Sequence, residues 1–187
     1  LAFAFGCNIG CSVVIAQLFG AKKLRELKTA VSTNLIFSGV LTMALMLLGF
    51  LLVPSLLTLM RVPAGIYAES LHYLNIYTGG LLFLFFYNIS SGIFSALGDS
   101  RTPFFFLACS STANVFLDVL FVKLFPHLGV ASVAWATFLC QGVSCVLAVA
   151  ALFRRLRGFA TEGRVKLFDW ALLRRIIRIA LPSTLQQ

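Results

Sequence analysis

Four oxygen-bearing side chains, those of Asn88, Asn114, Asp118 and Thr137, are the groups in this chain best suited to bind a cation. Asp118 is the one carboxylate inside a long apolar segment. A charge there costs roughly 2.5–3.5 kcal/mol on insertion scales, so such a residue faces the protein interior or water. Hard cations such as Na⁺ prefer oxygen ligands, and a desolvated carboxylate can take up a proton instead. The pattern predicts a coupling site for Na⁺ or H⁺; the alternative is a polar cluster that only joins helices.

Helix geometry places these four side chains at two matched depths. At 1.5 Å per residue, Asp118 and Thr137 lie roughly 22 and 24 Å from the inner ends of their helices. Asn114 and Asn88 lie roughly 16 and 14 Å from theirs. Asn114 also shares a helix face with Asp118, one turn later. Three helices are therefore expected to contribute to one site.

No residue pattern typical of an enzyme occurs in the sequence. His72 and His127 are far apart, and the Asp99–Ser100 pair has no neighbouring base. An intramembrane enzyme would need a second catalytic group near Asp118, and the sequence offers none. We therefore expect no enzymatic activity and no cofactor besides the coupling ion. The five cysteines form no CxxC pair and have no histidine at metal-ligand spacing, so we interpret them as small packing residues: Cys7, Cys11, Cys109, Cys140 and Cys145.

The elements that must position the polar residues are long apolar helices. The chain is 60% hydrophobic and 11% charged, whereas soluble domains are about 25% charged. Five segments reach the roughly 20 residues needed to cross a bilayer, and they predict helices over residues 1–20, 29–54, 68–97, 103–125 and 130–153. The predicted fold class is an all-α, polytopic transmembrane helix bundle with five spans and the start of a sixth at residue 179.

The basic residues orient this bundle. Thirteen of the 15 Lys and Arg residues follow the first, third and fifth spans, and only Arg61 and Lys123 lie on the other side. The positive-inside rule then places residues 21–28, 98–102 and 154–178 in the cytoplasm. The net charge of +9 is thus explained by topology, and we expect no nucleic-acid partner. The last of these segments is partly amphipathic, which favours a linker lying at the membrane surface.

The sequence also contains residues typical of helix ends and of close contacts between helices. Gly6 and Gly10 form a GxxxG pair of the kind that lets membrane helices approach closely. The Gly98 to Pro103 turn combines a glycine that permits a left-handed helix end with a proline suited to a first helical turn. The chain opens within an apolar run and stops about one turn after Pro182. We interpret it as a piece of a longer protein.

Several motifs resemble those of the multidrug and toxic compound extrusion family. They are AQLFGAKK at residues 16–23, the 88–92 segment followed by ALGDSRTP at 96–103, NVFLD at 114–118, GVA at 129–131 with Thr137 and Gln141, and ALPS at 180–183 with Gln186. On this mapping, residues 1–153 are helices two to six of the family's N-lobe. Residues 154–178 are the cytoplasmic linker between the lobes, and residues 179–187 begin helix seven of the C-lobe.

The resemblance implies antiport, in which influx of Na⁺ or H⁺ drives export of cationic or amphipathic drugs. It implies a multi-pass protein of the inner (plasma) membrane that contacts lipid. The complete protein would also contain a first helix and a C-lobe, and it would be monomeric. A cation site in one branch of the family corresponds here to Asp118, Asn114, Thr137, Asn88 and Tyr73, with Na⁺ at the first three. Ser91 and Gln141 are the expected contributions to a substrate cavity.

Two other functions remain open at this stage. A lipid-linked oligosaccharide flippase of the same superfamily often lines its cavity with cationic residues. No Lys or Arg falls inside a span here, which favours a cationic substrate. A purely structural membrane subunit would tolerate the change Asp118→Asn without loss of transport.

Overall fold

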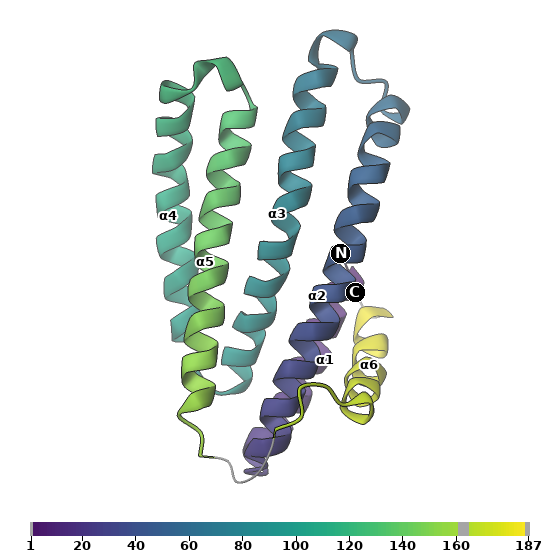
Figure 1. Cartoon of the computed structure of the whole chain (residues 1–187), viewed down its shortest axis with the longest axis vertical. Helices are drawn as coiled ribbons and strands as arrows, with labels where there is room; N and C mark the ends of the chain where they lie inside the picture. The colour runs from purple at the N-terminus through teal and green to yellow at the C-terminus, as the bar shows by residue number, and fades with distance from the viewer. Residues whose placement is uncertain (1, 161–164, 186–187) are drawn as a thin grey trace.

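The computed structural model describes the backbone of residues 2–160 and 165–185, and the side chains of residues 10–126, 128–160 and 165–180. The described residues form helices and no strands: α1 (Ala2–Gly20), α2 (Leu24–Leu59), α3 (Ala64–Ala96), α4 (Arg101–Leu124), the short 3₁₀ helix η1 (Pro126–Leu128), α5 (Ala131–Arg157) and α6 (Trp170–Leu185). Figure 1 shows α2 to α5 standing side by side, with α1 behind α2 and α6 beside their lower part.

Four helices, α2 to α5, are long and apolar enough to cross a membrane, and the Gly10–Gly20 part of α1 is a shorter apolar helix. On α4 only Pro103 is buried, and large apolar side chains such as Phe104 and Phe116 are exposed. So much contiguous apolar surface is unfavourable in water and suits a hydrocarbon environment or a covering protein partner. The all-helical, polytopic fold predicted from the sequence is confirmed.

Several helix boundaries differ from the sequence prediction, and α2 and α3 begin five and four residues earlier than expected. We expected the second helix to end at Pro54, but α2 continues through this proline to Leu59. The carbonyl oxygen of Pro54 remains bonded, because the Thr58 hydroxyl donates to it at 2.9 Å. The helix ends where Arg61 adopts a positive φ of 53°.

The last helix begins at Trp170 rather than at residue 179, and α5 continues to Arg157, so thirteen residues of the expected linker are helical. Its first turn is capped by Asp169, whose Oδ1 accepts the backbone N–H groups of Ala171 (2.9 Å) and Leu172 (3.3 Å). A carboxylate also interacts favourably with the positive end of the helix dipole. These hydrogen bonds hold the pKa of Asp169 below its usual value.

The turn between α3 and α4 has the predicted geometry. Gly98 has a φ of 80°, and the Asp99 N–H donates back to the Phe94 carbonyl at 2.9 Å, which closes the end of α3. The Asp99 carboxylate accepts the Thr102 N–H at 3.1 Å and its hydroxyl at 2.8 Å. Both hydrogen bonds lower the pKa of Asp99, and the bond from the Thr102 hydroxyl has the larger effect. One short segment thus ends one helix and caps the next.

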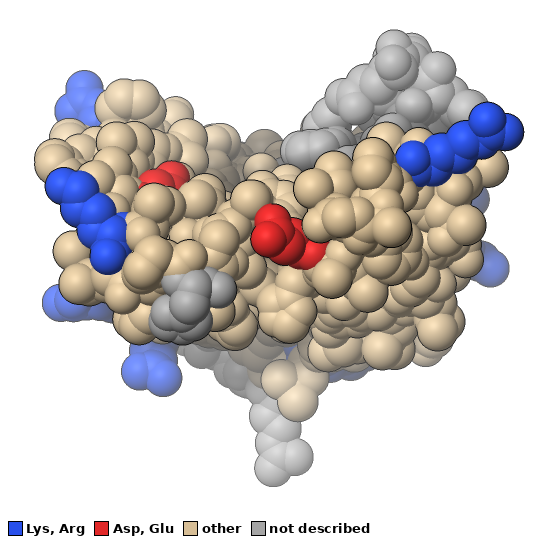
Figure 2. All heavy atoms as spheres, turned by 90° about the horizontal axis from the view of Figure 1, so that it is seen from above, with Lys and Arg blue, Asp and Glu red and all other residues tan. Residues whose placement is uncertain are grey.

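The core is concentrated at one end of the bundle, which we call the basic end. The α1–α2 connection, Arg101 and the end of α5 lie there. Here five helices contribute to one buried cluster: Cys11, Val14, Ile15, Leu18, Leu27, Ala30, Val31, Leu35, Ile89, Ile93, Phe94, Leu97, Leu152, Leu156 and Ile176. The opposite end has a smaller cluster of Ile76, Ala131 and Ala134. Viewed onto that opposite end, the basic side chains lie at the periphery of a largely uncharged surface (Figure 2).

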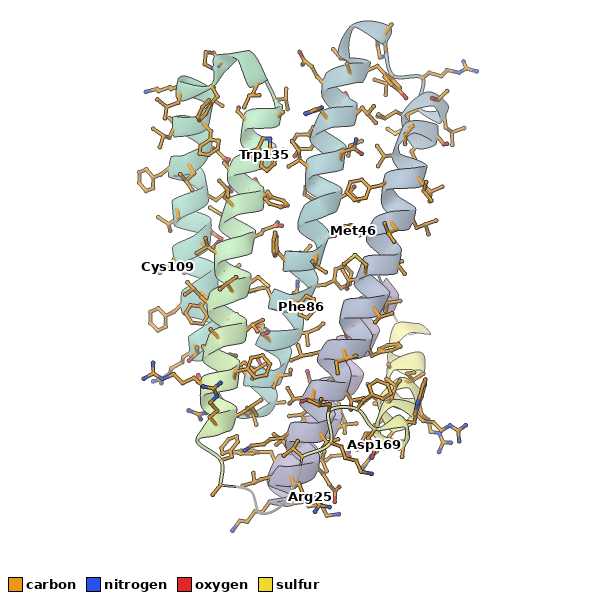
Figure 3. The ribbon with its side chains drawn as sticks, viewed as in Figure 1. Arg25, Met46, Phe86, Cys109, Trp135 and Asp169 are labelled. Atoms are coloured by element: carbon orange, nitrogen blue, oxygen red, sulfur yellow. The ribbon has the colours of Figure 1, made fainter. Side chains whose placement is uncertain are left out.

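Helix α1 approaches α6 closely at Gly10. A Cβ added there would lie 2.8 Å from the Ile176 carbonyl oxygen and 2.9 Å from the Ala180 backbone nitrogen. Gly10 therefore serves the close approach that the GxxxG pair predicts, while Gly6 and Cys7 lie outside the described side chains. Three of the four described cysteines are buried and none is in a disulfide; the fourth, Cys109, is exposed on α4 (Figure 3).

Candidate functional site

Asn114 bridges Asp118 on its own helix and Thr137 on the neighbouring one. The Asn114 amide Nδ2 lies 3.4 Å from Asp118 Oδ1 and 3.4 Å from Thr137 Oγ1. All three side chains are partly buried. Both hydrogen bonds are longer than the usual 2.7–3.2 Å for N–H···O, so the cluster is loosely closed. The structure brings these three predicted residues together; their role in coupling stays a prediction.

The antiparallel register of α4 and α5 creates this bridge. Asn114 faces Thr137, and one turn closer to the basic end the Ser110 hydroxyl donates to the Cys140 carbonyl at 3.3 Å. The Ser144 hydroxyl donates to that same carbonyl at 2.8 Å. Small polar residues recur at helical spacing on both facing surfaces, which lets the two helices lie close and keeps their contact polar.

A cavity of about 180 Å³ adjoins the bridge on its basic-end side. Helices α3, α4 and α5 line it with Phe83, Leu84, Tyr87, Leu107, Ser110, Ser111, Asn114, Thr137, Cys140, Gln141 and Ser144. This volume is many times what one water molecule needs, but it is below the roughly 300–1,000 Å³ of pockets for drug-sized ligands. The cavity therefore suits water and a small ion rather than a whole drug molecule.

Gln141, predicted for a substrate cavity, lies in this lining. Its Oε1 atom is 3.1 Å from where a Cβ of Gly80 would stand. The absence of a side chain at Gly80 is what allows the amide to lie against α3. Tyr87 closes the other side, where its hydroxyl donates to the Pro103 carbonyl at 2.7 Å and joins α3 to the start of α4.

The residues predicted on α3 do not join the bridge. The Asn88 amide donates to the Leu84 carbonyl of its own helix at 2.7 Å. Tyr73 stacks on Tyr77 with ring centroids 6.4 Å apart and packs against the small cluster at the opposite end. Neither residue lines the described cavity, nor does Ser91. Matched depth alone did not predict which residues meet, because depth along α3 does not determine the helix face on which a side chain lies.

The chemistry of the bridge fits a monovalent cation or a proton. It offers one carboxylate, one amide and one hydroxyl, and a half-turn of the Asn114 amide would add its oxygen to those of Asp118 and Thr137. Among the described residues no three His, Cys, Asp or Glu side chains cluster as a metal site would require. The donor set therefore suits a hard ion of single charge better than a transition metal.

Five further cavity residues with hydroxyl or thiol groups were not among the predicted site residues: Tyr87, Ser110, Ser111, Cys140 and Ser144. The spacing in the sequence could have indicated most of them. On α5, residues at intervals of three and four share one helix face: Thr137, Cys140, Gln141 and Ser144. Ser110, Ser111, Asn114 and Asp118 do the same on α4. No spacing pattern in the sequence indicated Tyr87.

Long, lipid-suited helices, with the Asp118 carboxylate beside a cavity that hydroxyl and amide side chains help to line, define a polytopic membrane protein. The MatE family model matches residues 1–120. The chain belongs to the MatE family.

Relatives and structures agree with this assignment. The "Probable multidrug resistance protein YoeA" of Bacillus subtilis (strain 168) is 29% identical over 191 residues, which cover 99% of this chain and 41% of that protein. The "Probable multidrug resistance protein NorM" of Listeria monocytogenes serotype 4b is 29% identical over 185 residues, covering 96% and 41%. The crystal structure of "MATE in the straight conformation" superposes with a TM-score of 0.83 at 26% identity, covering 100% and 41%. The chain thus spans about two fifths of these relatives.

Proposed function

We propose that the protein containing this chain exports cationic or amphipathic compounds, driven by influx of Na⁺ or H⁺, and that Asp118 carries the coupling charge. The observation that carries the proposal is the bridge from Asp118 through Asn114 to Thr137, beside a cavity that hydroxyl and amide side chains help to line. The names of the relatives support the multidrug substrate class.

Each residue of the bridge has a distinct task in this proposal. Asp118 provides the negative charge that one cation or proton neutralises. Thr137 provides a neutral oxygen from the second helix, so that binding draws α4 and α5 together. Asn114 donates to both when the ion is absent and turns its oxygen inward when the ion is present. The long 3.4 Å contacts leave the bridge weakly held, which lowers the cost of this exchange.

The proposal extends to the arrangement of the whole protein. Residues 1–153 would form the helices of one lobe, and α6 would begin the second lobe, which the relatives' remaining length would complete. Substrate would bind between the lobes, and rocking of one against the other would alternate its access to the two sides of the membrane. The basic end would face the cytoplasm of the cell.

The test is dye export by the full-length protein in proteoliposomes under an imposed Na⁺ or H⁺ gradient. We expect the wild-type protein to export a fluorescent cationic dye and Asp118→Asn to lose gradient-driven export while remaining folded. Asp99→Asn is the matched control, because it makes the same chemical change in a turn outside the bridge. Normal export by Asp118→Asn would refute the proposal, and lipid transbilayer movement without dye export would favour a flippase.

A further inference from the structure

Residues 165–178, which we call the interfacial segment, combine exposed apolar and basic side chains at the basic end. Within its helical part, Trp170, Arg174 and Arg178 are spaced four residues apart and form one stripe along α6. The residues Leu173 and Ile176 on the other face are buried. The segment is therefore amphipathic, and its inner face is already occupied by the rest of the bundle.

The apolar part of the exposed stripe is unusual for a surface in water. Trp170 is 76% exposed and Leu167 is 75% exposed. The Phe168 ring meets Trp170 edge-on, with centroids 5.2 Å apart, so three apolar side chains gather at the start of α6. Tryptophan is enriched at the headgroup level of membranes, where its ring is partly in the acyl region and its N–H group is hydrated.

The basic part is largely unneutralised. Arg174 and Arg178 are exposed and make no hydrogen bond or ion pair with another described residue, while Arg175 donates to the Gln17 amide oxygen at 2.7 Å. The nearby acid, Asp169, is engaged by the α6 backbone and lies 3.7 Å from Lys166. Among the described residues, Arg174 and Arg178 therefore have no acidic partner.

The segment is held in place by the bundle. The Asp169 N–H donates to the buried Thr33 hydroxyl at 3.0 Å. Further back along the chain, the Lys28 ammonium donates to the Phe159 carbonyl at 2.8 Å. Figure 3 shows Asp169 at the same end of the molecule as Arg25 in the first turn of α2. The stripe is thus presented at one end of the apolar helices, where lipid headgroups lie.

We infer that the interfacial segment binds anionic phospholipid headgroups of the leaflet at the basic end. Arginines supply the charge and hydrogen bonds to phosphate, and Trp170 with Leu167 enters the boundary between headgroups and acyl chains. A soluble anion would satisfy the arginines but would leave the apolar side chains in water. The combination therefore favours a lipid. This inference does not depend on the proposed transport activity.

The experiment uses the full-length protein in nanodiscs that contain dansyl-labelled phosphatidylglycerol or dansyl-labelled phosphatidylcholine. Energy transfer from Trp170 is isolated by subtracting the signal of Trp170→Phe. We expect stronger transfer to the anionic lipid, and loss of this preference in 1 M salt because a screening length near 3 Å removes the attraction. The double variant Arg174→Gln/Arg178→Gln should weaken the preference by roughly 5- to 30-fold, since each basic residue contributes about fivefold near an anionic surface.

Two matched variants sharpen the result. Arg61→Gln/Lys123→Gln removes the same charge from the opposite end and should leave the preference unchanged. Arg174→Lys/Arg178→Lys should keep most of it, which separates loss of charge from misfolding. Equal transfer to both lipids, or a preference unaffected by Arg174→Gln/Arg178→Gln, would overturn the inference. It would also be overturned if inorganic phosphate abolished the preference, or if Trp170 reached no lipid because another part of the polypeptide covers it.

Discussion

Gly10 in α1 lies directly against the backbone of Ala180 in α6, so that a single added carbon would stand 2.9 Å from the Ala180 nitrogen. The Ile176 carbonyl oxygen would be equally close, at 2.8 Å. Both neighbours are backbone atoms that cannot rotate away as a side chain would. The contact therefore fixes the distance between the first and last helices of the described bundle.

Replacing Gly10 with alanine should separate these helices and destabilise the protein. Crowding a well-packed interface costs typically 1–3 kcal/mol, and we expect a lower midpoint of thermal unfolding in detergent. Gly65→Ala is the control, because nothing lies within 4 Å of a Cβ at that exposed position. There the substitution should be neutral or stabilise by about 0.4–1 kcal/mol. A Gly10→Ala protein as stable as the wild type would show that the two helices can move apart freely.

Two adjacent buried residues of α2 should respond oppositely to loss of their polar groups. Thr33 accepts the Asp169 N–H, so Thr33→Val leaves that donor unpaired and should cost about 1–3 kcal/mol. Asn34 is fully buried, and neither its Nδ2 nor its Oδ1 has a hydrogen-bond partner among the described residues. Asn34→Leu should therefore be neutral or stabilising. Thermal unfolding in detergent compares the two, and a strongly destabilised Asn34→Leu protein would reveal a bound water or an unseen partner.

The helix cap at Asp99 should make stability depend on acid. Because the native pKa of Asp99 is lowered, its ionised form stabilises the fold above the unfolded-state pKa, near 3.9. This contribution is lost as the pH falls through the lower native value. Thr102→Val removes the hydroxyl that lowers the pKa most, so part of the acid dependence of the unfolding midpoint should disappear. An unchanged pH profile in Thr102→Val would mean that other carboxylates dominate acid unfolding.

The three cysteines around α4 and α5 should differ in their reaction with thiol reagents in the membrane. Cys140 lines the cavity beside Asn114 and Thr137, so a single-cysteine protein with Cys140 should react with a water-soluble methanethiosulfonate. Cys145 is buried away from the described cavity and should react several-fold more slowly. Cys109 is exposed on the apolar surface of α4 and should prefer a lipid-soluble maleimide. Equal rates for Cys140 and Cys145 would indicate that the cavity holds no water.

Much of the fold could be predicted because hydropathy and the residues that end helices are local properties of the sequence. The Gly98 turn follows from the glycine and proline at its ends, and the shared face of Asn114 and Asp118 follows from helix periodicity. The start of α6 did not, because its cap at Asp169 lies in a basic stretch that lacks the apolar pattern of a span. Pro54 misled the prediction of the end of α2, since a proline inside a long membrane helix is tolerated more often than in soluble proteins.

The candidate site was predictable only where neighbouring helices met in the expected register. Thr137 joins Asn114 because α4 and α5 are joined by a short connection and run antiparallel. Asn88 and Tyr73 lie on a helix whose rotation about its own axis depends on α1, α2 and α5 together. No local pattern carries that information, so these two residues could be placed in depth but not around the helix.

The uneven distribution of the core has a mechanical consequence. With five helices joined at the basic end and only a small cluster at the other, the bundle resembles a set of lever arms that share one fulcrum. Helix α2 has 36 residues, a length of roughly 54 Å at 1.5 Å per residue. A tilt of a few degrees about the fulcrum therefore moves its far tip by several ångströms. Small changes in helix tilt at the basic end are thus amplified at the opposite end of the bundle.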